Sequence, residues 1–400
     1  MLRFLTAGES HGPSLTVIVD GVPAGLRLTT EQIARDLARR QLGYGRGRRM
    51  AIEKDRADIV GGVRHGETLG SPIALRIDNK DWTNWLHTMA VDTPADDLPG
   101  ARRAAVTRPR PGHADLSGGI KYDRDDLRDI LERASARETA SRVAAGAVAR
   151  ALLHAIGITI HSHVTAIGGV TVPADADTSA ARLAALPDDD DVRCVDAATA
   201  DRMRAAIDAA KAAGDTVGGT FEVVAHGVPA GLGSHTQWDR KLDGRLAQAL
   251  MSIHAIKAVG IGVGHDAGTL PGSGVHDEIL AGAATGTLPG IVRPTNRAGG
   301  LEGGITNGED VRVSAVMKPI ATLMKPLRSI DLTTMADAPA TIERSDVCAV
   351  PAAAVVGEAM VAWVLAEAVV EKFGGDTLED LLANVAAYRA RVATRLGSPS

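Results

Sequence analysis

The feature that most constrains this chain is an internal repeat, because a repeat requires two halves built on the same backbone plan. Residues 8–21 reappear in outline at 214–227, and both copies continue into an identical Gly-Val-Pro-Ala-Gly-Leu at a shift of 206 residues. The copies differ in reactive side chains, since His11 in the first corresponds to Val217 in the second. We therefore expect an enzyme site formed between two similar halves, with its chemistry placed unevenly.

Two further matches keep the same order along the chain. Glycines and a threonine of residues 61–70 recur at 299–308, and Arg133-Ala-Ser135 recurs as Arg344-Ser-Asp346 before a second Ala-rich stretch. The shift changes between these blocks, which indicates insertions between them. We expect one domain with pseudo-twofold symmetry over residues 1–400, its repeated halves at about 1–165 and 214–375.

Composition limits the class of protein. The 400 residues carry a formal charge of −5 and 2% aromatic side chains, which argues against a nucleic-acid surface built from basic and stacking groups. Cys194 and Cys348 form no disulfide or zinc pattern, so we expect a protein of the reducing cytoplasm without a metal site. The apolar stretch 352–370 contains Glu358 and Glu367, and we interpret it as a buried core helix rather than a membrane span.

Hydrophobic periodicity predicts a mixture of strands and helices. Strands are predicted at 15–20, 73–77 and 311–316, and few β-α-β alternations occur, so we expect an α+β fold with mostly antiparallel sheet. The acidic run 188–191 is interpreted as a solvated surface loop. Helices are predicted at about 31–41, 126–156, 200–213, 239–258, 352–373 and 378–395.

Several arginine-rich segments are candidates for binding anions. The first holds Arg39, Arg40, Arg46, Arg48 and Arg49 around glycines that would let a loop wrap a ligand. Guanidinium groups match phosphate and carboxylate oxygens two at a time. A solvated basic helix end explains the same residues equally well.

A second candidate segment combines arginines with a histidine. Prolines stiffen residues 108–115, which carry Arg108, Arg110 and His113. A histidine beside two arginines suits a general acid for a departing phosphate. An ordinary surface turn is the alternative.

Two more segments share the repeated Arg-Ser pattern. On a continuous helix Arg133 and Arg137 would lie on one face, where an anion or a carboxylate between them would relieve their repulsion. Arg344-Ser-Asp346 could bind an anion and orient a polar ring. The alternatives are pairing with nearby acids for the first segment and helix capping for the second.

Taken together, these segments resemble chorismate synthase. The resemblance implies an enzyme that converts 5-enolpyruvylshikimate-3-phosphate to chorismate by 1,4-anti elimination of phosphate, with reduced FMN although the reaction is redox-neutral. It also implies a β-α-β sandwich, with antiparallel sheets around a helical layer, assembled as a homotetramer. The motifs that carry it span about residues 1–375 and are Gly8-Glu-Ser-His-Gly12, Arg39-Arg-Gln-Leu-Gly-Tyr-Gly-Arg-Gly47, Arg108-Pro-Arg-Pro-Gly-His-Ala-Asp115, Arg133-Ala-Ser-Ala-Arg-Glu-Thr-Ala140, Asn296-Arg-Ala-Gly-Gly300, Met317-Lys-Pro319 and Arg344-Ser-Asp-Val-Cys348.

The same correspondence implies roles for single residues. His11 would protonate the leaving phosphate and His113 the reduced flavin, Ser10 and Ser135 would relay protons, and Asp346 would assist deprotonation through the flavin. Arginines would hold the substrate, and two of them are also positions given to NADP(H): Arg40 and Arg46, with Arg49, Arg110 and Arg137. The flavin positions are Arg133, Ala134, Ser135, His254, Ala255, Gly303, Lys318, Pro319, Ile320, Ala321, Thr322 and Arg344.

Some positions depart from the family pattern. His254 replaces a usual Gln or Asn, Gly260 replaces a usual Glu, and residues 263–285, expected to be a loop, diverge. Because the sequence shows no appended reductase domain, we expect an external flavin reductase to supply reduced FMN. The alternatives to this enzyme are a polyanion-binding protein that uses the arginine clusters and an inactive paralogue.

Overall fold

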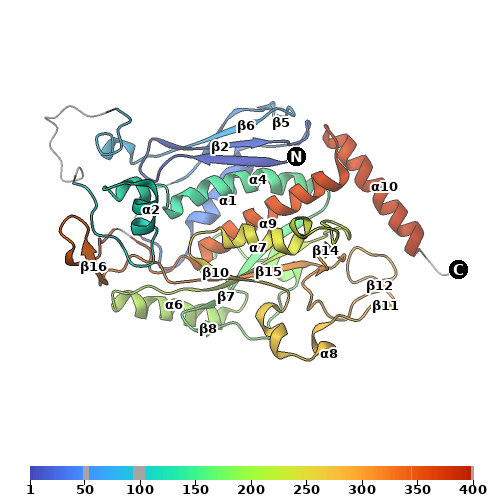
Figure 1. Cartoon of the computed structure of the whole chain (residues 1–400). Helices are drawn as coiled ribbons and strands as arrows, with labels where there is room; N and C mark the ends of the chain where they lie inside the picture. The colour runs from blue at the N-terminus through green and yellow to red at the C-terminus, as the bar shows by residue number, and fades with distance from the viewer. Residues whose placement is uncertain (48–53, 93–103, 344, 398–400) are drawn as a thin grey trace.

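The chain forms two antiparallel sheets with helices lying between them (Figure 1). The computed structural model describes residues 1–47, 54–92, 104–343 and 345–397. The first sheet has the order β1 (Arg3–Ala7), β2 (Ser14–Asp20), β6 (Ile73–Asp78) and β3 (Ala57–Gly61). The second has the order β10 (Ile256–Ile261), β15 (Val311–Met317), β9 (Gly219–His226), β7 (Thr159–Ile167) and β8 (Val170–Thr171).

Strand alternation explains why the first sheet packs on one side. Val17 and Val19 of β2 are fully buried, whereas Ile18 between them faces outward. The register pairs Val17 with the buried Leu75 of β6, so apolar side chains of neighbouring strands face the helices together. The predictions for β2, β6 and β15, and of mostly antiparallel sheet, are confirmed.

The central helices are α1 (Thr30–Gln41), α4 (Thr139–Ala155), α7 (Leu242–Met251) and α9 (Val350–Phe373). Helix α4 contacts β2, helix α9 contacts β7 and β9, and the two helices pack on each other. They approach closely at Gly146, where an added Cβ would lie 2.3 Å from the Cβ of Ala359. Helix α9 has a mean hydropathy of 1.9 and the length of a membrane span, but 89% of its apolar window is buried inside the protein. It is a core helix, as predicted.

Two predicted helices are shorter than expected. The helix predicted at 126–156 is broken into α3 (Arg128–Leu131), the 3-10 turn η4 (Ala136–Glu138) and α4, because Ser135 takes an extended backbone with ψ of 144° and caps η4. The helix predicted at 239–258 is α7 alone, since the left-handed Ala255 (φ 66°) turns the chain into β10. The sequence suggests Thr30 as the cap of the helix predicted at about 31–41, but Thr29 caps α1, through a capping box with Gln32.

The remaining elements cover the outside of these layers. Helix α6 (Ala197–Ala212), predicted at about 200–213, is followed by Gly214 at φ 70°, and α10 (Leu378–Leu396), predicted at about 378–395, is capped by Thr377. The divergent segment 263–285 holds two short helical turns and a strand rather than a continuous loop. The smaller elements are β4 (Val63–Arg64), β5 (Glu67–Thr68), η2 (Trp82–Asn84), α2 (Asp115–Tyr122), α5 (Ala180–Ala184), η5 (Trp238–Arg240), η6 (Gly264–Thr269), α8 (Gly272–Val275), β11 (Leu280–Ala281), β12 (Ile291–Val292), β13 (Leu301–Glu302), β14 (Ile305–Thr306), β16 (Arg328–Asp331) and β17 (Ala336–Pro339).

Candidate active site

His11 lies in the turn between β1 and β2, against the segment that precedes η4. Its Nδ1 is 2.9 Å from both carboxylate oxygens of Glu132, and its ring stacks on Trp85 at 3.7 Å with an interplanar angle of 21°. The Glu132 side chain is 1% exposed. Burial opposes its ionisation, but the hydrogen bonds and charge of His11 keep the pKa of Glu132 below its ordinary value. The pair therefore places an ionised carboxylate directly on the imidazole.

Two serine hydroxyls meet beside this pair. Ser135 Oγ donates to Ser10 Oγ at 3.1 Å, and the backbone N–H of Ser10 donates to the carbonyl of Glu132 at 3.0 Å. Ser135 also accepts from the backbone N–H of Arg137 at 3.4 Å. The structure thus brings together three of the predicted site residues, His11, Ser10 and Ser135.

Arg133 and Arg137 do not share a helix face, so that prediction is wrong. The Arg133 guanidinium donates to the carbonyls of Gly8 and Thr6, both at 3.0 Å, and so holds the turn that carries His11. Arg137 lies beyond the break at Ser135 and donates to Asp55 at 2.9 Å. Ala134 closes α3 by donating to the Ile130 carbonyl at 3.0 Å.

Arg40 meets Arg137 at the same carboxylate. Arg40 Nη1 lies 3.5 Å from Asp55 and its Nε donates to Thr139 Oγ1 at 2.9 Å. The carboxylate relieves the repulsion between two buried cations, because Asp55 faces both of them. Two of the predicted substrate arginines therefore form one buried cluster.

The glycine-rich loop after α1 is tied to the segment before α9. Arg46 pairs with Asp346 at 2.8 Å, and the other oxygen of Asp346 accepts the backbone N–H of Gly47 at 2.7 Å. Gly45 is left-handed (φ 84°), and an added Cβ there would lie 2.7 Å from Ile207. Two residues with separate predicted roles, Arg46 and Asp346, are thus adjacent, whereas the predicted Arg49 and Arg344 lie outside the described residues.

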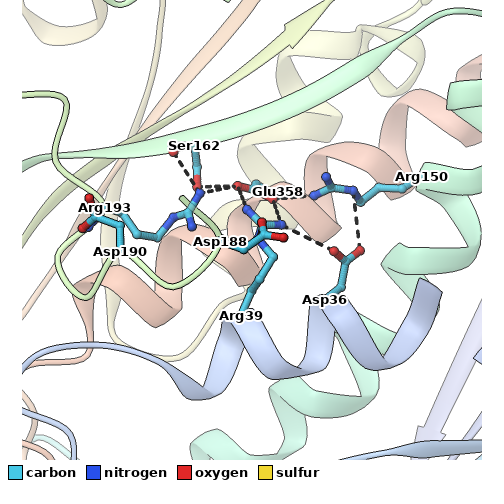
Figure 2. A network of polar contacts seen from close by, with 8 residues as sticks. All are labelled: Asp36, Arg39, Arg150, Ser162, Asp188, Asp190, Arg193 and Glu358. Atoms are coloured by element: carbon cyan, nitrogen blue, oxygen red, sulfur yellow. Dashed lines mark hydrogen bonds and ion pairs between the residues drawn. The ribbon is translucent and has the colours of Figure 1, made fainter. Parts of the chain in front are cut away.

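Arg39 is predicted either to bind an anion or to lie in solvent at a basic helix end. It does neither, because it is buried in a network of carboxylates (Figure 2). It makes a two-pronged bond to the fully buried Glu358 of α9, at 2.7 and 2.8 Å. Glu358 also bonds Arg150, Arg193 at 3.2 Å and Ser162 at 2.7 Å. Part of the acidic run 188–191 joins this network: Asp188 pairs with Arg39 at 3.0 Å, and Asp190 accepts from the Arg193 backbone at 2.6 Å. Asp36 of α1 pairs with Arg39 and Arg150.

His113 has a carboxylate partner of its own. Its Nδ1 lies 2.5 Å from Asp115, which also accepts from Arg110 Nε at 2.8 Å. Burial again opposes ionisation, but hydrogen bonds from His113 and Arg110 hold the pKa of Asp115 well below its ordinary value. Arg110 Nη1 donates to Thr322 Oγ1 at 3.1 Å. Loop 108–115 is thereby joined to one of the predicted flavin positions.

The other predicted flavin positions mostly gather around this loop. Lys318 Nζ donates to the carbonyl of Gly112 at 2.6 Å, and its backbone N–H donates to the carbonyl of Ala255 at 2.9 Å. The segment Lys318, Pro319, Ile320, Ala321 and Thr322 meets the loop at both of its ends, through Lys318 and Thr322. Between them, the carbonyl of Ile320 accepts from Thr216 at 2.8 Å. Arg133, Ala134 and Ser135 lie instead beside the turn of His11. Gly303 lies apart from both groups, because it turns the hairpin β13–β14 next to His235, away from β16 in Figure 1.

The pKa of His254 is affected by charges from both groups, those of Arg133 beside the His11 turn and of His113. Burial lowers its pKa, Glu138 opposes this, and the charges of Arg142, His113 and Arg133 lower it further. Its Nδ1 is buried and has no hydrogen-bond partner among the residues that the structure describes. A buried polar atom without a partner fits a site where a ligand supplies the missing group.

Sequence reasoning missed the carboxylates that complete the site. Asp115 could have been found, because it stands two residues after His113 in the quoted motif. Glu132 directly precedes Arg133, but nothing local shows that it faces His11. Asp55 and Trp85 carried no signal.

The comparisons with known proteins agree with one another. A family model described as chorismate synthase matches residues 2–370. The chain belongs to the chorismate synthase family. A relative from Moorella thermoacetica named chorismate synthase is 60% identical over 389 residues, covering 97% of this chain and 98% of the relative. One from Geobacter sulfurreducens, with the same name, is 56% identical over 391 residues, covering 97% of this chain and 98% of the relative.

A solved structure supports the same assignment at the level of the fold. A crystal structure of chorismate synthase superposes with a TM-score of 0.78 at 44% sequence identity, and the match covers 98% of each chain. The mixture of helices and antiparallel sheets is therefore that of the family.

Proposed function

We propose that the described residues around His11 and His113 form the active site for the reaction of this family, the elimination of phosphate from 5-enolpyruvylshikimate-3-phosphate to give chorismate. The observation that supports it is the pairing of each histidine, through Nδ1, with a buried carboxylate. A histidine held in this way can deliver a proton in a fixed direction. His11 would protonate the leaving phosphate, and Ser10 and Ser135 beside it would relay protons.

The arginines supply the charge that the substrate needs. Arg40 donates to the carbonyl of Ala136 and Arg137 donates its backbone N–H to Ser135. Arg110 lies beside His113, and Arg46 lies in the loop after α1, paired with Asp346. Fixed cations in a site that excludes water stabilise anions far better than cations in water do. We assign Arg40, Arg46, Arg49, Arg110 and Arg137 to the substrate's phosphate and carboxylates. A role for Arg40 and Arg46 toward NADP(H) would place a second anion at the same cations.

The cofactor proposed for this site is reduced FMN. The donors of Lys318, Arg110 and Thr322, together with the unpartnered Nδ1 of His254, suit an anionic, polar ring system with a phosphate. When bound, reduced flavin would supply the electron density and the base that removal of the C6 proton requires. His113 would hold a proton at this group, and Asp346 would orient the loop of Arg46 toward it.

The proposed pseudo-twofold duplication is supported by the order of elements. Strands β1, β2, β6 and β3 neighbour each other in the first sheet as β7, β9, β15 and β10 do in the second. At the shift of the sequence repeat, β2 corresponds to β9, and α4 to α9. Together with the helices between the sheets, this arrangement fits a β-α-β sandwich built from two copies of one unit in a single domain.

We propose a cytoplasmic homotetramer supplied by an external flavin reductase. The open face of the first sheet carries Leu5, Ile18 and Val60 exposed at 74%, 38% and 59%, and the register pairs Leu5 with Ile18. An apolar stripe on a sheet surface marks a contact between protein chains. Light scattering of the purified protein would test the tetramer.

The deciding experiment follows phosphate and chorismate in an anaerobic mixture of protein, enolpyruvylshikimate phosphate and chemically reduced FMN. We expect both products in equal amounts, and none with oxidised FMN. Tight FMN binding without turnover would identify an inactive paralogue. Absence of both binding and turnover, with salt-dependent polyanion binding, would favour the alternative use of the arginines.

A further inference from the structure

His11 and three neighbouring side chains form a closed ring of contacts. His11 faces both oxygens of Glu132 at 2.9 Å, and its backbone N–H also donates to Glu132 Oε2 at 2.9 Å. Arg128 Nη1 donates to Glu132 Oε1 at 3.4 Å, and its guanidinium carbon lies 5.5 Å from the Trp85 ring centroid. Trp85 closes the ring by stacking on His11 at 3.7 Å. The imidazole is therefore held along one edge and on one face.

The chemistry of Glu132 decides which imidazole nitrogen can react. The groups of His11 and Arg128 that face it are donors, and they keep the pKa of the carboxyl low despite its burial. An ionised carboxylate can only accept hydrogen bonds, so the facing Nδ1 carries hydrogen in both protonation states of the ring. Nε2 is then the atom that gains and loses the proton.

We propose that Glu132 is a positioning residue for His11, and that Trp85 fixes the plane of the imidazole. This inference rests on the proposed role of His11 as proton donor to phosphate. As the carbon–oxygen bond to phosphate breaks, the Nε2 proton passes to a phosphate oxygen. The ring becomes neutral while its Nδ1 hydrogen stays on the Glu132 hydrogen bond. No tautomer exchange is required between turnovers.

The test is Glu132→Gln, which keeps the shape of the side chain. Its amide NH₂ would face the hydrogen-bond donors of His11 and Arg128 without being able to accept from them. We expect kcat to fall about 10²- to 10⁴-fold, the usual contribution of general acid–base catalysis, with KM nearly unchanged. In ¹⁵N spectra of histidine-labelled enzyme, the chemical shifts of His11 should show hydrogen fixed on Nδ1 in the wild type and no longer show it in the variant. Glu132→Asp, which keeps the charge, should recover part of kcat.

A matched control lies in the second sheet. Glu222 of β9 bonds His163 Nε2 at 3.0 Å and Arg312 at 2.6 Å, so Glu222→Gln also removes a carboxylate from a histidine and an arginine. Because none of the hydrogen-bond partners of Glu222 and His163 is a predicted site residue, kcat should stay within about twofold of the wild type, as expected for independent sites. Circular dichroism of both variants checks that they are folded.

Three outcomes with Glu132→Gln would overturn the inference. The first is wild-type kcat in Glu132→Gln, and the second is an unchanged ¹⁵N pattern. The third is that Glu132→Gln lowers kcat by the same factor in a His11→Ala background as in the wild type. If Glu132 acts through His11, its effect should disappear once His11 is removed. Full kcat in His11→Ala alone would remove the role of His11 and the inference with it, yet leave the family reaction standing. No turnover by the wild type would instead count against the reaction.

Discussion

Replacing Glu358 with Gln should lower the free energy of unfolding more than removing a surface ion pair of this protein would. Three arginines share this fully buried carboxylate, which also accepts from Ser162. After the change Arg39 and Arg150 share the buried Asp36 at 3.4 and 3.5 Å, so one buried carboxylate remains for two arginines. Arg39 also keeps Asp188, which is 62% exposed, and Arg193 keeps the carbonyl of Ser162 at 3.2 Å. Removing one partner of a buried ion pair costs about 3–5 kcal/mol, because the other charge stays buried. We expect a loss of that size in the free energy of unfolding.

Urea unfolding followed by circular dichroism measures this loss as a shift in midpoint at constant slope. The control is Asp337→Asn, since Asp337 pairs with Arg328 at 3.2 Å and these side chains are 81% and 91% exposed. An exposed pair contributes about 0–1 kcal/mol. Equal small losses in both variants would refute the argument from burial.

The pH dependence of Glu358→Gln has a definite sign. Burial raises the pKa of this carboxyl, but Arg39, Arg150 and Arg193 outweigh it and hold the pKa well below the ordinary value. The stabilisation is therefore fully present above the unfolded pKa of about 4.3 and is lost as the pH falls further. The difference between wild type and variant should shrink in acid.

Three other changes test the site and the core. Arg46→Ala should raise KM and lower kcat/KM at least about tenfold, the value of one bond to a charged group, and unchanged kinetics would remove Arg46 from the site. Burial is the largest cause that lowers the folded pKa of His254 below the unfolded value of about 6.5, and neighbouring cations add to it. As the pH drops through that value the unfolded chain takes up the proton first, so the free energy of unfolding falls. His254→Gln should flatten this slope by up to about 1.4 kcal/mol per pH unit in urea titrations, and an identical slope would show that His254 is not the group. Gly146→Ala would place a Cβ 2.3 Å from that of Ala359 and should lower the unfolding free energy by about 1–3 kcal/mol in urea, whereas a neutral result would mean that the helices move apart freely.

Local patterns predicted those elements whose structure depends on local rules. Strands β2, β6 and β15 alternate because one face of each is buried, and α10 begins at Thr377 because that side chain caps it. The break at Ser135 could not be predicted, since the residues around it favour a helix. Bonds from Arg133 to Gly8 and from Ser135 to Ser10 hold the break, and both cross more than a hundred residues of sequence.

The same limit applies to the site. Motifs identified His11 and His113 because each stands in a recognisable sequence context. The carboxylate on His11 depends on how the β1–β2 turn meets the segment before η4, and the one on Arg39 depends on the packing of α1 against α9. Charge pairs of this kind are set by tertiary structure, and neither spacing nor composition encodes them.

The close contact between α4 and α9 has a consequence for how the chain is made. Gly146 and Ala359 meet in the core although most of the second half is translated between them. Ribosomes add about 5–20 residues per second, so roughly 10–40 s separate the emergence of the two helices. For that interval α4 can already pack on α1 and β2, but the face that packs on α9 has no partner. The nascent chain must be protected from aggregation until its last quarter appears, and the order of synthesis sets when the core can close.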